Sequence, residues 1–177
     1  MARSRWAVGV AITLLSFGLS IAASAESDSK TVQVTATILP RLELSVSPET
    51  GQTIAFGPIT QPADGMTAAR SVKVNVNVFS NLDRPYQVTQ LVRQPLSSAR
   101  GSTIPEGQLL VSARDAARGQ LGPVQPTAIV TGAATTLYRS DGRGKSDAFS
   151  ADYTLRVTPD TPAGDFQTEI VYTVTSL

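Results

Sequence analysis

The alternation of apolar and polar residues with a period of two constrains the fold of this chain more than any other feature of its sequence. The pattern is clearest in the stretch RSVKVNVNVFSN, residues 70–81. Successive side chains of a strand point to opposite faces of a sheet, so this stretch predicts a strand with one buried and one solvated face. The buried face is predicted to hold Val72, Val74, Val76 and Val78, and the solvated face Lys73, Asn75 and Asn77.

The same alternation occurs on both sides of Pro40. After the proline, the residues predicted to share a face are Leu42, Leu44 and Val46. Before it, Thr31–Ile38 forms another candidate strand, whose apolar face is predicted to hold Val32, Val34, Ala36 and Ile38. Because proline cannot donate to a β ladder, Pro40 marks an edge, a bulge or a passage between sheets.

The rest of the sequence predicts strands separated by glycine- and proline-containing turns. Tyr86–Leu91 alternates and is predicted to form an antiparallel hairpin with residues 70–81. The segments DYTLRVTP and FQTEIVYTVTSL are predicted to form a second hairpin through the turn Pro159–Asp165. Their inward-facing residues are predicted to be Tyr153, Leu155 and Val157 in the first and Phe166, Ile170, Tyr172 and Val174 in the second. Shorter strands are predicted at Gln108–Ser112, Ala128–Thr131 and Thr135–Tyr138.

Together these strands predict an all-β protein. After the first 25 residues, no segment shows convincing helical periodicity. About seven to nine strands with Greek-key-like spacing predict an immunoglobulin-like antiparallel β-sandwich, with a jelly roll as the alternative. We expect this sandwich to form a single domain over residues 26–177.

The first stretch, MARSRWAVGVAITLLSFGLSIAASA, predicts a signal peptide over residues 1–25. Arg3 and Arg5 precede an apolar run, and Ala23-Ser24-Ala25 is a small-x-small pattern that signal peptidase accepts. The run is short and interrupted, which disfavours an uncleaved membrane anchor. We therefore expect cleavage after Ala25, export to the periplasm, the cell surface or the medium, and no membrane span after removal of the signal.

The composition excludes several classes of function. The chain contains neither cysteine nor histidine, which removes disulfides, Ser-His-Asp and Cys-His nucleophiles and histidine zinc sites. Its 15 basic residues are nearly balanced by 14 acidic ones and are scattered, so no face is predicted to bind nucleic acid. We expect no cofactor, no metal site and no enzymatic activity.

Carboxylates are the remaining candidates for acid–base catalysis, since a glycosidase needs only two of them across a cleft. The candidates are Asp115, Asp141, Asp147, Asp152 and Asp165. No two of them show motif spacing, and an aspartate beside glycine typically caps its own turn. The loop RSDGRGKSD, Arg139–Asp147, lacks the ligand pattern of an EF-hand and predicts an exposed hairpin loop.

Two segments, KTVQVTATILPRLEL and AGDFQTEIVYTVTSL, flank this cysteine-free β domain. The arrangement resembles the alpha-class fimbrial subunits exported by the chaperone–usher route. That resemblance implies an N-terminal strand followed by an incomplete immunoglobulin-like fold. It also implies self-association, or a periplasmic chaperone and other surface subunits, as partners.

A second resemblance is to cell-surface β-sandwich domains of the WxL type. The segments that carry it are YTLRV at Tyr153–Val157 and AGDF at Ala163–Phe166, although the defining tryptophan motif is missing. Both resemblances imply a structural or surface protein. We expect either a pilus-type subunit or, as the alternative, a freestanding binding module that serves adhesion; a secreted hydrolase that uses carboxylates ranks third.

If the chain is a pilus-type subunit, residues 26–40 are predicted to act as a donor strand and hinge. In β-augmentation, main-chain hydrogen bonds give affinity while alternate side chains fill pockets of the acceptor. Here those side chains are predicted to be Val32, Val34, Ala36 and Ile38. In the alternative, Thr31–Ile38 is the first strand of the chain's own domain, because a corner and a hinge at Pro40 look alike in sequence.

Overall fold

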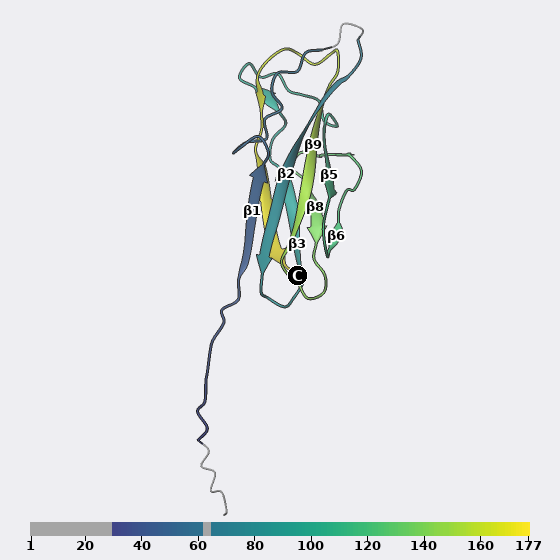
Figure 1. The fold of residues 1–177 in the computed structure, drawn as a ribbon. Coiled ribbons are helices and arrows are strands. Elements are labelled where there is room, and N and C mark those ends of the chain that lie inside the picture. Colours follow the sequence, from purple (N-terminus) through teal and green to yellow (C-terminus); the bar gives the residue numbers. More distant parts are fainter. Residues whose placement is uncertain (1–29, 62–64) are drawn as a thin grey trace, which may run out of the picture. The chain divides into compact units, whose positions relative to one another are not determined.

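The computed structural model describes residues 30–61 and 65–177 (Figure 1). The predicted signal peptide and its cleavage site lie outside the described residues. The chain divides into two units, Met1–Thr37 and Ile38–Leu177, and all strands of the described residues lie in the second. In these described ranges, no helix is long and apolar enough to span a membrane.

The second unit is built from antiparallel strands, which confirms the all-β prediction. The strands are β1 Leu42–Pro48, β2 Ala68–Ser80, β3 Tyr86–Val92, β4 Ser97–Ser98, β5 Leu109–Arg114, β6 Gln120–Leu121, β7 Thr127–Ala128, β8 Ala134–Arg139, β9 Asp147–Val157, β10 Phe166–Gln167 and β11 Ile170–Ser176. The predicted strands at Gln108–Ser112 and Thr135–Tyr138 correspond to β5 and β8. The predicted strand at Ala128–Thr131 is reduced to the short β7.

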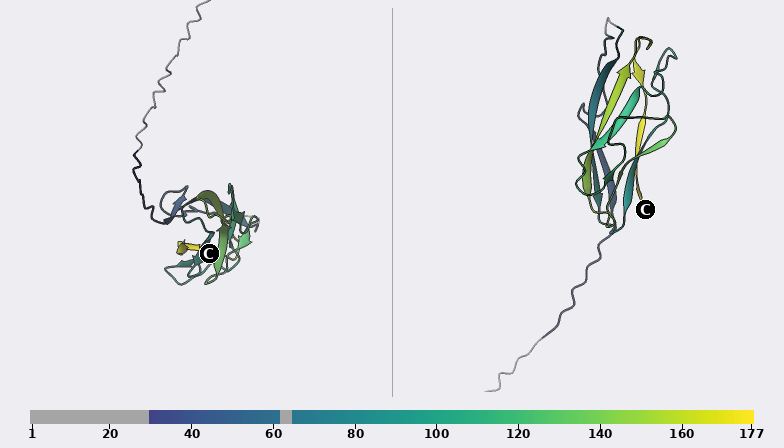
Figure 2. Two further views of the ribbon diagram at one scale, coloured as in Figure 1. Left: turned by 90° about the horizontal axis from the view of Figure 1, so that it is seen from below. Right: turned by 90° about the vertical axis from the view of Figure 1, so that its right-hand side faces the viewer.

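Two main sheets pack face to face as a β-sandwich (Figures 1 and 2). The five-stranded sheet has the order β1-β2-β9-β5-β7, and the four-stranded sheet has the order β11-β3-β8-β6. A two-stranded ribbon joins β10 to β4. Side chains from both inner faces form one hydrophobic cluster, which includes Val76 of β2, Val88 of β3 and Tyr153 of β9.

The predicted inward faces are confirmed. On β2, Val72, Val74, Val76 and Val78 are at most 7% exposed. On β9, Tyr153, Leu155 and Val157 are likewise buried. On β1, half-buried residues alternate with exposed ones along the whole strand. Period-two alternation therefore identified the buried face of each of these strands.

The predicted hairpin between residues 70–81 and 86–91 is wrong. β2 pairs with β1 and β9, whereas β3 pairs with β8 and β11. The connection between them crosses from one sheet to the other: Asn81 N donates to Arg41 O beside β1 (3.2 Å), and Leu177 N donates to Pro85 O after β11 (2.8 Å). Alternation shows which face of a strand is buried but not which strand lies beside it.

Two other predicted hairpins are wrong for the same reason. The turn Pro159–Asp165 leads from β9 in the five-stranded sheet toward β11 in the four-stranded sheet. The loop Arg139–Asp147 connects β8 and β9, which also lie in opposite sheets. In a sandwich both sheets bury one face, so consecutive strands satisfy the same pattern whether they pair or face each other.

Thr31–Ile38, called the arm below, is not part of any strand. The prediction that it is the first strand of the chain's own domain is therefore wrong, since the first strand of the described residues is β1. Every residue of the arm is exposed, and Val32, Val34 and Ile38 are 81%, 90% and 84% exposed. The arm combines a strand-like sequence with no strand partner in the described part of the chain.

Candidate functional site: a groove between β1 and β11

Strands β1 and β11 are the edge strands of the two main sheets on one side of the sandwich. They run past each other in contact, one from each sheet. An edge strand presents main-chain N–H and C=O groups that a further strand can pair with. This side of the sandwich therefore presents the long edge strands of both main sheets together.

The pairing of β11 shows which of its main-chain groups are free. Hydrogen bonds from Arg93 N to Glu169 O and from Leu177 N to Pro85 O set the phase of the ladder with β3. In an antiparallel ladder, residues alternate between pairing with the neighbour and pointing away from it. Odd-numbered residues of β11 thus bond to β3, and the main-chain groups of Ile170, Tyr172 and Val174 point to the open edge.

The same reasoning applies to β1. Hydrogen bonds from Asn81 N to Arg41 O and from Glu49 N to Lys73 O (2.9 Å) set the phase of its ladder with β2. The main-chain groups of Leu42, Leu44 and Val46 therefore point to the open edge. Their side chains are half-buried against the core. Each open edge thus combines free main-chain groups with inward-facing apolar side chains.

A cavity of about 1400 Å³ opens between these edges where β1 ends and β11 begins. Apolar side chains from the core form its floor, among them Leu109, Leu155 and Val157. Its walls are the segment Gln52–Gln61, which follows β1, and residues 161–169, which precede β11. We call this open cavity and the edges beside it the groove.

A chain of hydrogen bonds crosses the floor of the groove. Tyr172 Oη donates to Tyr153 Oη (2.7 Å), which donates to Gln90 Oε1 (2.6 Å). Gln90 is 1% exposed, and its Nε2 has no hydrogen-bond partner among the described residues. Tyr153 and Tyr172 were predicted to face inward, and both rings pack on the core, where their hydroxyls form these hydrogen bonds.

Burial fixes the protonation of this network. Burial raises the pKa of Tyr172 to about 12, while its hydrogen bond to Tyr153 acts in the opposite direction. Burial also raises the pKa of Tyr153 well above its usual range, as does the neighbouring Tyr172. Both phenols therefore stay neutral at physiological pH and act as hydrogen-bond donors rather than as bases.

The segment Gln52–Gln61 was not predicted to carry function. It contains no strand, yet Ile54, Phe56 and Ile59 are half-buried and pack against the core cluster. The signal was present in the sequence TIAFGPI, where Ile54 and Phe56 are spaced by two residues as in a strand. Glycine and proline follow immediately, so the pattern was too short to be recognised.

The predicted carboxylate candidates do not meet in the groove. Asp115 and Asp152 both contact Arg114 on the outer surface, and Asp141 accepts a hydrogen bond from Arg143 N within its own turn. Only Asp165 lines the groove wall.

Asp147 has a structural role on the opposite side of the sandwich. Its carboxylate accepts hydrogen bonds from Tyr138 Oη (2.7 Å) and from the main-chain N–H of Arg118 (2.9 Å) and Ala117 (3.3 Å). Burial by itself would raise the pKa of Asp147, but the hydrogen bonds from Tyr138 and the main chain lower it below its usual value of 3.8. The carboxylate thus anchors the loop between β5 and β6.

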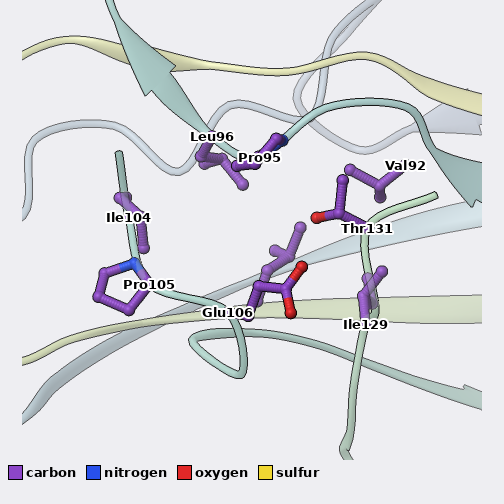
Figure 3. Close-up of a pocket in the computed structure, with 9 residues that line it drawn as sticks. Val92, Pro95, Leu96, Ile104, Pro105, Glu106, Ile129 and Thr131 are labelled. Atoms are coloured by element: carbon purple, nitrogen blue, oxygen red, sulfur yellow. The ribbon is translucent and has the colours of Figure 1, made fainter. Parts of the chain in front are cut away.

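Figure 3 shows a second, much smaller cavity. It shares the lining residues Leu96, Ile104 and Leu109 with the groove. Its volume is about 20 Å³, and its lining includes Ile104, Glu106 and Ile129. This space admits about one water molecule and no larger ligand. Over residues 30–61 and 65–177, no cluster of acidic side chains could hold a metal ion.

The groove is therefore the site whose geometry offers a defined interaction. No protein-family model and no curated protein matches the chain. The interpretation of the groove depends on its own geometry, which suits an extended segment with apolar residues at every second position.

Proposed function

We propose that the chain is an exported structural subunit that assembles by strand donation, in which the arm of one copy occupies the groove of another. The observation that carries this proposal is the groove itself, an apolar cavity flanked by two open strand edges. A donated strand would pair with the free main-chain groups of β11 and place alternate side chains on the floor. This is the mode of assembly that the fimbrial resemblance implies.

The arm fits the groove in length and chemistry. Its eight residues match the seven residues of β11, and an extended chain rises about 3.3 Å per residue in both. Its apolar face consists of Val32, Val34, Ala36 and Ile38, all of them exposed. Transfer of these side chains onto an apolar floor would stabilise the complex by about 25 cal/mol for each Å² removed from water.

The strand order supports the assignment of the sandwich as immunoglobulin-like. The order β1-β2-β9-β5 corresponds to strands A, B, E and D of such a domain, and β11-β3 corresponds to F and C. In that fold a further strand, G, lies beside F. A donated arm beside β11 would occupy the place of strand G.

The attachment point of the arm favours open-ended assembly. The chain leaves the sandwich before β1, where Asn81 Nδ2 donates to Leu39 O (3.0 Å). The cavity lies beyond Val46, at the other end of the same strand. An interface that joins opposite ends of two copies is heterologous, so it propagates into a linear array unless a rotation closes it.

Substitutions on the two faces of the arm test this proposal. Val34→Asp would place a carboxylate on the apolar floor, and we expect it to abolish concentration-dependent assembly in analytical ultracentrifugation. Thr35→Asp introduces the same charge into the neighbouring, outward-facing position and should leave assembly intact. Equal behaviour of the two variants, or a wild-type chain that stays monomeric at high concentration, would refute strand donation.

A further inference from the structure

We infer that Gln52–Gln61 is a displaceable plug that occupies part of the groove in the free subunit and must leave before a donated strand can enter. This inference builds on the strand donation proposed above and concerns its regulation. It begins from the position of the segment, because every residue from Gln52 to Gln61 lines the groove. The segment therefore lies on the path of an incoming strand.

The plug imitates an inserted strand through its side chains alone. Ile54, Phe56 and Ile59 are half-buried against the core cluster. Within the described ranges, no main-chain hydrogen bond connects residues 52–61 to a neighbouring strand. The plug shields apolar surface, but among the described residues it provides no main-chain partner for the edge-facing groups of β11 and β1.

Few polar contacts hold the plug in place. At its start, Ala55 N donates to Thr50 Oγ1 (3.2 Å), a contact within the same loop. At its end, Gln61 Nε2 donates to Thr158 O (3.0 Å) and Thr161 O (2.9 Å). Between these contacts the segment is held by the apolar packing of Ile54, Phe56 and Ile59, and all of it lines the open cavity. Its packing is therefore weaker than that of a paired strand.

A donated strand would replace this packing and add ladder hydrogen bonds. The observed affinity and association rate then depend on the fraction of molecules in which the plug has left the groove. The plug protects the apolar floor in the free subunit and makes assembly slower than insertion into an open groove. Weakening the plug should consequently accelerate strand binding.

The test measures binding of a fluorescent peptide that spans Lys30–Leu39. The acceptor is the full chain carrying Val34→Asp, so that its own arms do not compete. Adding Phe56→Ala removes the largest side chain of the plug, and we expect the peptide to associate about tenfold faster and to bind correspondingly more tightly. Gln61→Ala, which frees the end of the plug, should act in the same direction. Val124→Ala truncates an apolar side chain that is 60% exposed outside the groove and should change nothing.

Each outcome bears on a distinct claim. Peptide binding at an unchanged or slower rate in both plug variants, with circular dichroism confirming that they are folded, would overturn the plug while leaving strand donation intact. A peptide that binds none of the acceptors would refute strand donation and the plug with it. Acceleration in Phe56→Ala and Gln61→Ala but not in Val124→Ala is the result we expect.

Discussion

The sheet edges on the two sides of the sandwich differ in whether a short strand covers them. On one side, the short strands β7 and β6 cover β5 and β8, and further main-chain bonds run from Ala113 N to Pro123 O and from Gly122 N to Leu137 O. On the other side, β1 and β11 have no added strand in the described structure. The comparison shows that the chain itself covers β5 and β8 on the closed side, whereas on the open side β1 and β11 remain edge strands within the described residues.

A glycine shows how tightly the closed side is built. A Cβ atom at Gly122 would lie 1.9 Å from Thr136 O, so no larger residue fits without moving the backbone. Gly119 is similarly crowded by Arg139 O and the Tyr138 ring. By contrast, the open side keeps a cavity of about 1400 Å³. Close packing on one side and a cavity on the other are features of the same two sheets.

The largest expected effect on stability comes from a substitution in the core that both sides of the sandwich share. Val76 lies in the centre of the core with 0% exposure, so Val76→Asp buries an unpaired carboxylate and should cost on the order of 4 kcal/mol or more. We expect the variant to lose the β signal in circular dichroism. Asn75→Asp, one residue along on the outer face, should unfold close to the wild-type temperature; equal tolerance of both changes would show that the faces are misassigned.

A smaller effect should be confined to the closed side. Asp147→Asn weakens the hydrogen bonds to the loop between β5 and β6, and we expect a loss of about 1 kcal/mol near neutral pH, reduced by solvent screening. Because the folded state lowers the pKa of Asp147, its contribution is complete above the unfolded pKa of about 3.9 and disappears as the pH falls through the lower folded value.

Denaturant unfolding of the wild type and Asp147→Asn as a function of pH checks this sign. The difference in the free energy of unfolding should shrink below about pH 4. A difference that grows in acid would contradict the assigned role of the carboxylate. Peptide binding at the groove should be unchanged in Asp147→Asn, since the residue lies on the other side of the sandwich.

The sequence pattern predicted which face of each strand is buried, but it did not predict which strands lie side by side. Val72 to Val78 and Tyr153 to Val157 were assigned correctly because burial of one strand face imposes a period of two. The pairing of β3 with β11 rather than with β2 could not be predicted, since both inner faces of a sandwich satisfy the same pattern. The groove forms where two particular edge strands lie together, so it could not be predicted from the pattern of any single segment.

The arm and β1 illustrate the remaining limit. Thr31–Ile38 and Leu42–Pro48 have the same alternation, yet β1 pairs along its full length with β2, while the arm pairs with no strand among residues 30–61 and 65–177. Alternation indicates that a segment can form a strand, but the strand forms only where another strand is available to pair with it. Gln90 was a further indication of the polar network in the core. A glutamine on the inward face between Val88 and Val92 requires hydrogen-bond partners inside the core.

Amide hydrogen exchange at the two sides tests strand donation most directly. In the monomeric Val34→Asp chain, the N–H groups of Tyr172 and Val174 on the open edge should exchange faster than those of Ala113 and Gly122, which are bonded on the closed side. Addition of the Lys30–Leu39 peptide should slow exchange at Tyr172 and Val174 and leave Ala113 and Gly122 unchanged. If Tyr172 and Val174 exchange at the same rate with and without saturating peptide, the groove does not accept the arm and the account is wrong.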